Sequence, residues 1–93
     1  MAKINWTSKS IKDLKSLHDY IANDSKVYAI RFVSRVIERV EQLIEFPESG
    51  RVVPEKEDNS IRELIEGNYR IFYKLQKNKV SILRIHHSAK RIK

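Results

Sequence analysis

The sequence contains no cysteine, two glycines and two prolines among its 93 residues. The absence of cysteine excludes disulfide scaffolds, thiolate zinc sites and cysteine nucleophiles. Two glycines are too few for a glycine-rich phosphate loop, which disfavours nucleotide-dependent enzymes. Apolar runs are short, and Met1–Asn5 lacks the apolar segment of a signal peptide. We therefore expect a protein with no membrane-spanning segment, located in the cytoplasm.

Positive charge is what the sequence has in excess. Lys and Arg number 19 against 12 Asp and Glu, a formal net charge of +7, while hydrophobic residues make up 41%. That hydrophobic fraction supports a folded core, and the length predicts one domain covering residues 1–93. Because a strong positive field concentrates anions around a protein, we expect a polyanionic target or an acidic partner.

Two apolar stripes with helical spacing follow Ile4–Trp6, whose alternation predicts a short strand. Thr7–Ser8 is a typical helix N-cap, and the spacing after it predicts a helix that ends near Asn23. Asp24–Ser25 can cap a second helix, which Pro47 ends. Since the gap between the two is short, we expect an antiparallel helical hairpin whose stripes face a common surface.

After residue 50 the apolar periodicity changes to that of strands. Arg51–Pro54 is at most an edge strand because it ends in proline. Segments 61–66, 69–75 and 80–87 predict an antiparallel meander, with Gly67–Asn68 as a tight turn. The face predicted to pack on the helices carries Tyr69, Ile71, Tyr73 and Leu75. The resulting fold class is α+β, with a helical hairpin packed on one face of a small antiparallel sheet.

The sheet face opposite the helices is the predicted functional surface, because two helices can cover only one side. Strand parity places Arg70 there, and simple pairing adds a face of the next strand formed by Val80, Ile82, Arg84 and His86. Clustered Arg, Lys and His side chains can bind phosphate and move a proton near neutral pH. An ordinary solvated surface is the alternative. The candidate target-binding residues are Arg51, Arg62, Lys74, Arg84, Lys90 and Arg91.

Other candidate groups carry weaker signals. His86 and His87 point to opposite faces of a strand, so they cannot chelate one metal ion, and we expect no metal site and no cofactor. One of them is expected to pack near the core and the other to act as a general acid or base. An arginine ridge on the second helix is interrupted by glutamates and lacks a helix-turn-helix context, which disfavours direct DNA reading. Core or core-edge positions are expected for Tyr20, Tyr28, Tyr69 and Tyr73.

Several motifs occur in a recognisable order along the chain. Pro47-x-x-Gly50-Arg51 is followed by Arg62-Glu63-Leu64, by Tyr69-Arg70-Ile71-x-Tyr73 and by Ile82–His87. This order resembles the RelE/ParE superfamily of toxins from bacterial type II toxin–antitoxin systems, nearer ParE than RelE. The resemblance spans nearly the whole chain and implies the same fold as the periodicity. It also implies a cognate antitoxin whose N-terminal domain usually binds operator DNA, so the toxin would meet the operator only indirectly.

RelE-like members are ribosome-dependent mRNA endoribonucleases. By resemblance, Arg70 would bind the scissile phosphate, with Lys90 or Arg91 near a second basic position. The catalytic set of such an enzyme would be Arg70, Glu63, His86 and His87. However, Ile61 and Glu63 stand where RelE-type enzymes carry lysines, and the tail lacks the aromatic residue that stacks on a nucleobase.

ParE-like members inhibit DNA gyrase and have no known hydrolytic centre, and they resemble this chain more closely. We therefore expect a gyrase-inhibiting toxin of a plasmid-stabilisation system. The alternatives are a RelE-like nuclease and a non-toxic, basic nucleic-acid-binding module of the same fold. The expected partners are the antitoxin and either gyrase or the ribosome with its mRNA. The free toxin is expected to self-associate through the surface that the antitoxin covers.

Overall fold

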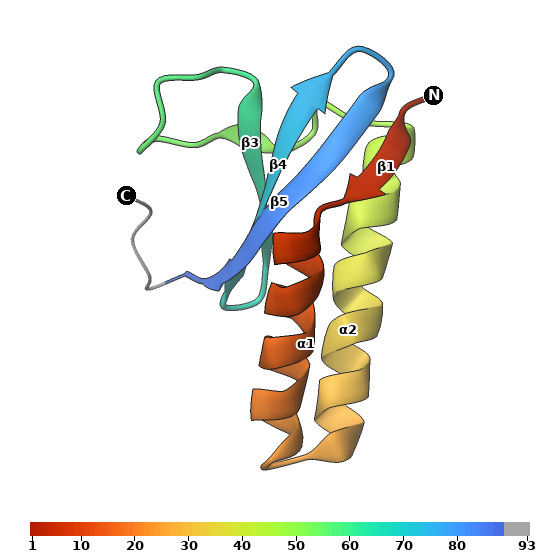
Figure 1. Cartoon of the computed structure of the whole chain (residues 1–93), viewed down its shortest axis with the longest axis vertical. Coiled ribbons are helices and arrows are strands. Elements are labelled where there is room, and N and C mark those ends of the chain that lie inside the picture. The colour runs from red at the N-terminus through yellow and green to blue at the C-terminus, as the bar shows by residue number, and fades with distance from the viewer. Residues whose placement is uncertain (89–93) are drawn as a thin grey trace.

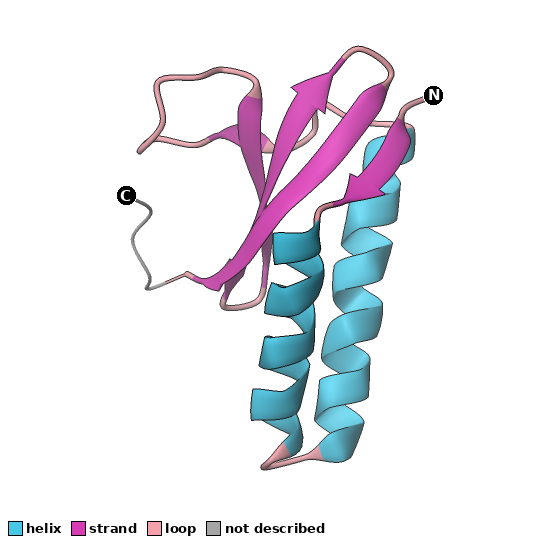
Figure 2. Ribbon diagram, viewed as in Figure 1, coloured by secondary structure: helices cyan, strands magenta, loops and turns pink. Residues whose placement is uncertain are grey.

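A computed structural model describes residues 1–88 and places two helices against one side of a five-stranded sheet (Figure 1). The elements in chain order are β1 (Lys3–Trp6), α1 (Ser8–Ala22), α2 (Lys26–Glu41), the 3-10 turn η1 (Gln42–Ile44), β2 (Arg51–Val52), β3 (Ile61–Glu66), β4 (Tyr69–Gln76) and β5 (Lys79–His87). The predicted α+β class is confirmed, and Figure 2 shows the helical and strand layers separately coloured.

The strand order across the sheet is β1-β5-β4-β3-β2. Strands β3, β4 and β5 form the predicted antiparallel meander, and β2 pairs antiparallel with β3 as a two-residue edge strand. The turn between β3 and β4 has Gly67 at φ +57°, a conformation that a tight hairpin turn requires and glycine adopts readily. Strand β1 pairs parallel with β5, so the sheet is mixed, and the helical hairpin supplies the long connection that a parallel pair requires.

Both helices begin at the predicted caps. The Thr7 side chain accepts a hydrogen bond from the Ser10 N–H at 3.2 Å, and the Ser25 side chain accepts one from the Tyr28 N–H at 3.1 Å. The helices run antiparallel, and their tip projects beyond the end of the sheet (Figure 1). Within the part of the chain that the structure describes, no helix is long and apolar enough to cross a membrane.

The core lies between the helices and the sheet face that the sequence predicted. From α2 and η1 it takes Phe32, Val36, Val40 and Leu43, and from the sheet it takes Leu64, Ile71, Tyr73, Val80, Ile82 and Ile85. Full burial of an aliphatic side chain of this size contributes about 1.5–3 kcal/mol. Packing of this one helical face therefore holds the two layers together.

A β-bulge in β5 reverses which side chains of this strand face the helices beyond residue 83. Phe72 lies opposite Arg84, whereas the next residue, Tyr73, lies opposite Ile82, so Leu83 is the extra residue. The prediction that Val80, Ile82, Arg84 and His86 share a face is therefore wrong. Val80 and Ile82 pack in the core, while the part of β5 beyond the bulge turns Arg84 and His86 to the opposite face. The bulge also explains how Ile82 and Ile85, three residues apart on one strand, both reach the core.

The tyrosines divide into two pairs. Tyr73 is fully buried and Tyr69 packs against the core, as predicted. Tyr20 and Tyr28 are 71% and 60% exposed, so the prediction of core or core-edge positions is wrong for these two residues. They lie near the tip of the helical hairpin, which projects beyond the end of the sheet (Figure 1).

Candidate functional site

A partly buried ionic network occupies the sheet face away from the helices. We call it the Glu63 network, and it consists of Arg51, Glu55, Glu63 and Arg70. Pairing of β2 with β3 sets Arg51 opposite Glu63, and the loop after β2 carries Glu55. Arg51 Nε donates to Glu63 Oε1 at 2.6 Å, and Arg70 Nε donates to Glu63 Oε2 at 3.0 Å. Arg70 also donates two hydrogen bonds to Glu55, from Nη1 to Oε2 at 2.7 Å and from Nη2 to Oε1 at 2.9 Å.

The burial of this network contradicts the expected exposed cationic surface. The side chain of Glu63 is 0% exposed and that of Arg70 is 8% exposed, whereas that of Arg51 is 63% exposed. Arg70 does lie on the face that strand parity predicted, with its guanidinium carbon 4.8 Å from the Phe72 ring centroid. The prediction of a bare surface centred on Arg70 is wrong because the loop after β2 folds over it and brings a second carboxylate.

Glu55 and Arg70 each favour the charged form of the other. The hydrogen bonds from Arg70 lower the pKa of Glu55 to about 2. In return, Glu55 and then Glu63 raise the pKa of Arg70 above its usual value, against the opposing effect of burial. Near neutral pH the Glu55 carboxylate and the Arg70 guanidinium are therefore both charged, and each balances the charge of the other.

The motif residues of the middle of the chain meet beside this network. The Tyr73 hydroxyl donates to the Pro47 carbonyl at 2.9 Å and accepts from the Gly50 N–H at 2.8 Å. Arg62 Nη1 donates to the carbonyls of Glu48 and Gly50, each at 3.0 Å. A Cβ on Gly50 would overlap the Tyr73 hydroxyl and lie 2.7 Å from the Glu63 carbonyl oxygen, so only glycine fits. The side chains of Tyr73 and Arg62 thus hold the turn before β2 against the sheet by hydrogen bonds to its backbone.

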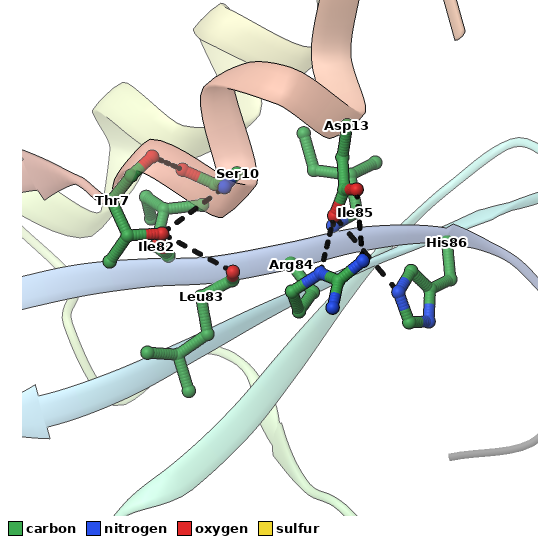
Figure 3. A network of polar contacts seen from close by, with 8 residues as sticks. All are labelled: Thr7, Ser10, Asp13, Ile82, Leu83, Arg84, Ile85 and His86. Atoms are coloured by element: carbon green, nitrogen blue, oxygen red, sulfur yellow. Dashed lines mark hydrogen bonds and ion pairs between the residues drawn. The ribbon is translucent and has the colours of Figure 1, made fainter. Parts of the chain in front are cut away.

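A separate set of contacts, made by Asp13 with Arg84 and the backbone of Ile85, joins α1 to the edge of β5 (Figure 3). We call this the Asp13 network. Asp13 Oδ2 accepts from Arg84 Nε at 2.7 Å and from the Ile85 N–H at 3.0 Å, and Asp13 Oδ1 accepts from Arg84 Nη2 at 3.1 Å. Strand β1 pairs with β5 only as far as Ile82. There the hydroxyl of Thr7, the residue after β1, donates a hydrogen bond to the Ile82 carbonyl at 2.6 Å. Asp13 therefore binds the β5 backbone just beyond the end of β1.

The pKa of Asp13 reflects two opposed effects. Burial works to raise it, but the hydrogen bonds from Arg84 and from the Ile85 N–H outweigh burial, and the pKa is lowered overall. The same pairing raises the pKa of Arg84. Arg84, predicted as a target-binding cation, is 39% exposed and forms an ion pair with Asp13.

The predicted catalytic residues are only partly brought together. Glu63 and Arg70 are hydrogen-bonded, and His86 lies directly across from Arg70 on β5 with its Nε2 4.0 Å from Asp13 Oδ2. The His86 side chain is 11% exposed, and its ring lies edge-on to Phe72 with a centroid distance of 5.8 Å. His87 points to the other face, edge-on to Tyr69. The prediction that the two histidines face opposite sides is confirmed.

The remaining predicted residues are more scattered. Lys74 is half-buried on β4, opposite Ile61, on the same face as Arg70. Lys90 and Arg91 lie outside the described residues. Among residues 1–88, no group of three His, Asp or Glu side chains is placed to hold a metal ion.

An aromatic cleft, which we did not predict from the sequence, lies between the hairpin tip and the turn joining β3 to β4. Its volume is about 300 Å³. Among its lining residues are Tyr20, Tyr28, Phe32, Arg35 and Tyr69. The sequence held one signal for it, since Tyr20 and Tyr28 both fall outside the apolar stripes of their helices.

Comparison with known proteins shows what this chain is similar to. The family model described as ParE toxin of type II toxin-antitoxin system, parDE, matches residues 4–92. The chain is 34% identical over 91 residues to Toxin RelE2 of Caulobacter vibrioides, a match that covers 97% of this chain and 99% of that protein.

Solved structures show the same arrangement. A chain of the chromosomal ParDE toxin–antitoxin system of P. aeruginosa matches with a TM-score of 0.75 and 25% identity, covering 94% of this chain and 96% of that one. The RelBE2 toxin–antitoxin complex of Mycobacterium tuberculosis shares the fold, with a TM-score of 0.69 at 21% identity and coverages of 92% and 96%. Together with the family match over nearly the whole length, these similarities show that the chain belongs to the ParE toxin family of type II toxin–antitoxin systems.

Proposed function

We propose that this toxin arrests growth by ParE-like inhibition of DNA gyrase in a plasmid-stabilisation system, and that a cognate antitoxin neutralises it. The observation that carries the proposal is the state of Arg70. A nuclease needs this guanidinium open to a scissile phosphate, but here it makes four hydrogen bonds to Glu55 and Glu63 and is 8% exposed. Two carboxylates at this position would also repel a phosphate. A non-hydrolytic mode of action fits this arrangement better.

Within this proposal, Arg51 is the cation that the Glu63 network offers to a target. Its side chain is 63% exposed, and Glu63 fixes its orientation through the contacts of both Nε and Nη2 with Oε1 at 2.6 Å. A guanidinium held in this way loses little conformational entropy when it binds a carboxylate or a phosphate.

A RelE-like ribonuclease is the second candidate, because the relative that is 34% identical carries the name Toxin RelE2. The proximity of Glu63, Arg70 and His86 also favours it. In that case Glu55 would have to leave Arg70 before a phosphate could bind.

Two assays on the purified chain separate the candidates. We expect supercoiling by DNA gyrase to be blocked, and mRNA on programmed ribosomes to stay intact. Arg70→Lys, which keeps a positive charge at the buried position, is the informative variant, and Lys77→Arg in the exposed turn after the same strand is its matched control. Cleavage of mRNA that Arg70→Lys abolishes, with supercoiling unaffected, would select the nuclease.

Growth is the simplest test of the toxin itself. Expression of the chain without its antitoxin should arrest bacterial growth, and co-expression of the antitoxin should restore it. Indifferent growth at high expression of soluble protein would contradict the proposal.

A further inference from the structure

The outer flank of α2 carries exposed apolar side chains in a regular spacing. Val27 and Ile30 are each 62% exposed, and Ile37 is 38% exposed. Together with Ser34, which is also exposed, they recur at spacings of three, four and three residues. This alternation is the repeat by which two packed helices keep one line of side chains in contact over several turns. We call these four residues the α2 seam.

The shape of the α2 seam is complementary to a second helix. Ser34 is the small residue at its middle, with Ile30 and Ile37 about one helical turn away on either side. A small side chain at the crossing point lets two helix axes approach to about 8 Å, the short end of the usual range. The isoleucines then fill the space on both sides of the crossing. The seam lies roughly a third of the way around α2 from the buried core face, so that face stays packed on the sheet.

The charges beside the α2 seam are separated along the helix. Lys26 and Arg31 lie in its N-terminal half, and Glu38 and Glu41 lie in its C-terminal half. All four side chains are exposed, and within the part of the chain that the structure describes none of them forms an ion pair. The seam is therefore positive at one end and negative at the other.

An antiparallel pair of α2 helices brings these opposite charges together. If the helices cross at Ser34, Arg31 of one copy lies opposite Glu38 of the other, and two-fold symmetry forms the same pair a second time. A parallel pair instead sets like charges side by side. Arg35 and Arg39 do not enter this contact, because Arg35 lines the aromatic cleft and Arg39 hydrogen-bonds to the backbone of β3.

We infer that the α2 seam joins two copies of this chain in an antiparallel, two-fold symmetric dimer. A two-fold interface must be complementary to itself, and the seam meets this condition in both shape and charge. The seam also lies in the helical layer, whereas the exposed Arg51 lies on the sheet face away from the helices. The dimer therefore leaves the cation that we propose for target contact accessible in both copies.

The expected affinity of the dimer is low. A single pair of helices buries less area than the roughly 1,600 Å² of a standard protein interface. The net charge of +7 on each copy also opposes association. We expect a dissociation constant of roughly 10–100 µM.

Sedimentation equilibrium of the purified full chain measures this association. Ile30→Glu and Ile37→Glu are the test variants, and Tyr28→Glu is the matched control, because Tyr28 is 60% exposed on the opposite flank of the same helix. Each test variant should raise the dissociation constant by about 30-fold or more, since a charge enters the interface once from each copy. Tyr28→Glu should leave the dissociation constant unchanged.

An exchange of charges tests the antiparallel orientation. Arg31→Glu and Glu38→Arg should each raise the dissociation constant by about 10-fold, because each sets like charges opposite one another twice. The double variant restores both ion pairs and should associate like the wild type. Both positions are exposed, so this rescue does not depend on a folding effect.

Four results would overturn the inference. A wild-type chain that stays monomeric well above the expected dissociation constant would show that no dimer forms. Equal association of Ile30→Glu, Ile37→Glu and Tyr28→Glu would place the contact between copies elsewhere. Weakened association of both single charge variants without rescue in the double variant would exclude the antiparallel pair. Loss of antitoxin binding in Ile30→Glu, with unchanged self-association, would assign the seam to the antitoxin.

Discussion

The Glu63 network and the Asp13 network use the same pairing chemistry at two depths. In each, a carboxylate receives hydrogen bonds from arginine at the sheet. The Glu63 side chain is 0% exposed and its partner Arg70 8%, whereas the Asp13 side chain is 16% exposed and its partner Arg84 39%. The Glu63 network lies on the sheet face away from the helices, and the Asp13 network joins α1 to the edge of β5. Because both networks pair arginine with a carboxylate, we expect burial to set the difference in what each contributes to stability.

Burial sets the cost of breaking an ion pair, because water can replace a lost partner only at a charged group that it can reach. Breaking a buried ion pair leaves a charge that water does not solvate, at a cost of about 3–5 kcal/mol, whereas an exposed pair is worth about 0–1 kcal/mol. The Asp13 network lies between these limits, because Asp13 also accepts a backbone hydrogen bond.

The largest effect is expected from Glu63→Gln. This change removes the shared partner of Arg51 and Arg70, so it should lower the free energy of unfolding by about 3–5 kcal/mol, measured by urea denaturation. Glu57→Gln, in the exposed loop after β2, is the matched control and should change it by less than about 0.5 kcal/mol. Equal effects of the two variants would mean that water reaches the Glu63 network and that the contrast in depth is false.

Asp13→Ala should have an intermediate effect. It leaves the Ile85 N–H without its acceptor and Arg84 without its carboxylate, so we expect a loss of about 1–3 kcal/mol. Asp13→Asn should lose less, because its amide oxygen can still accept from the Ile85 N–H. Hydrogen exchange of the Ile85 amide gives the local reading, with faster exchange in Asp13→Ala than in Asp13→Asn. Unchanged exchange in both variants would show that Asp13 does not protect this strand edge.

The smallest effect concerns Glu55 and appears only in acid. Its pKa is lowered from 4.5 to about 2 by Arg70, so the folded state binds fewer protons than the unfolded state between these values. The stabilisation is complete above about pH 4.5 and is lost as the pH falls towards 2. Melting temperatures measured from pH 6 to pH 2 should therefore fall less steeply for Glu55→Gln than for the wild type. Parallel curves would show that the contact between Glu55 and Arg70 does not form in solution.

The predictions that succeeded depended on local periodicity. Helix caps at Thr7 and Ser25, the core face carrying Ile71 and Tyr73, and the facing of Arg70 all follow from spacings of a few residues. The candidate site was harder to predict, because the polar stretch from Glu55 to residue 60 shows no period that would indicate its contact with Arg70.

The elements and their apolar faces follow from the sequence alone, because helix and strand periods are properties of neighbouring residues, and the excess of positive charge follows from composition. Three features depend on how the chain folds in space: the bulge at Leu83 reverses the facing of part of β5, Glu55 covers Arg70, and Tyr20 and Tyr28 are exposed at the hairpin tip. The physical reason is that burial depends on which distant segments come to lie over a residue. The path of a loop leaves no mark in the periodicity of the chain, and the reach of the helices beyond the sheet is indicated only by two tyrosines that fall outside the apolar stripes.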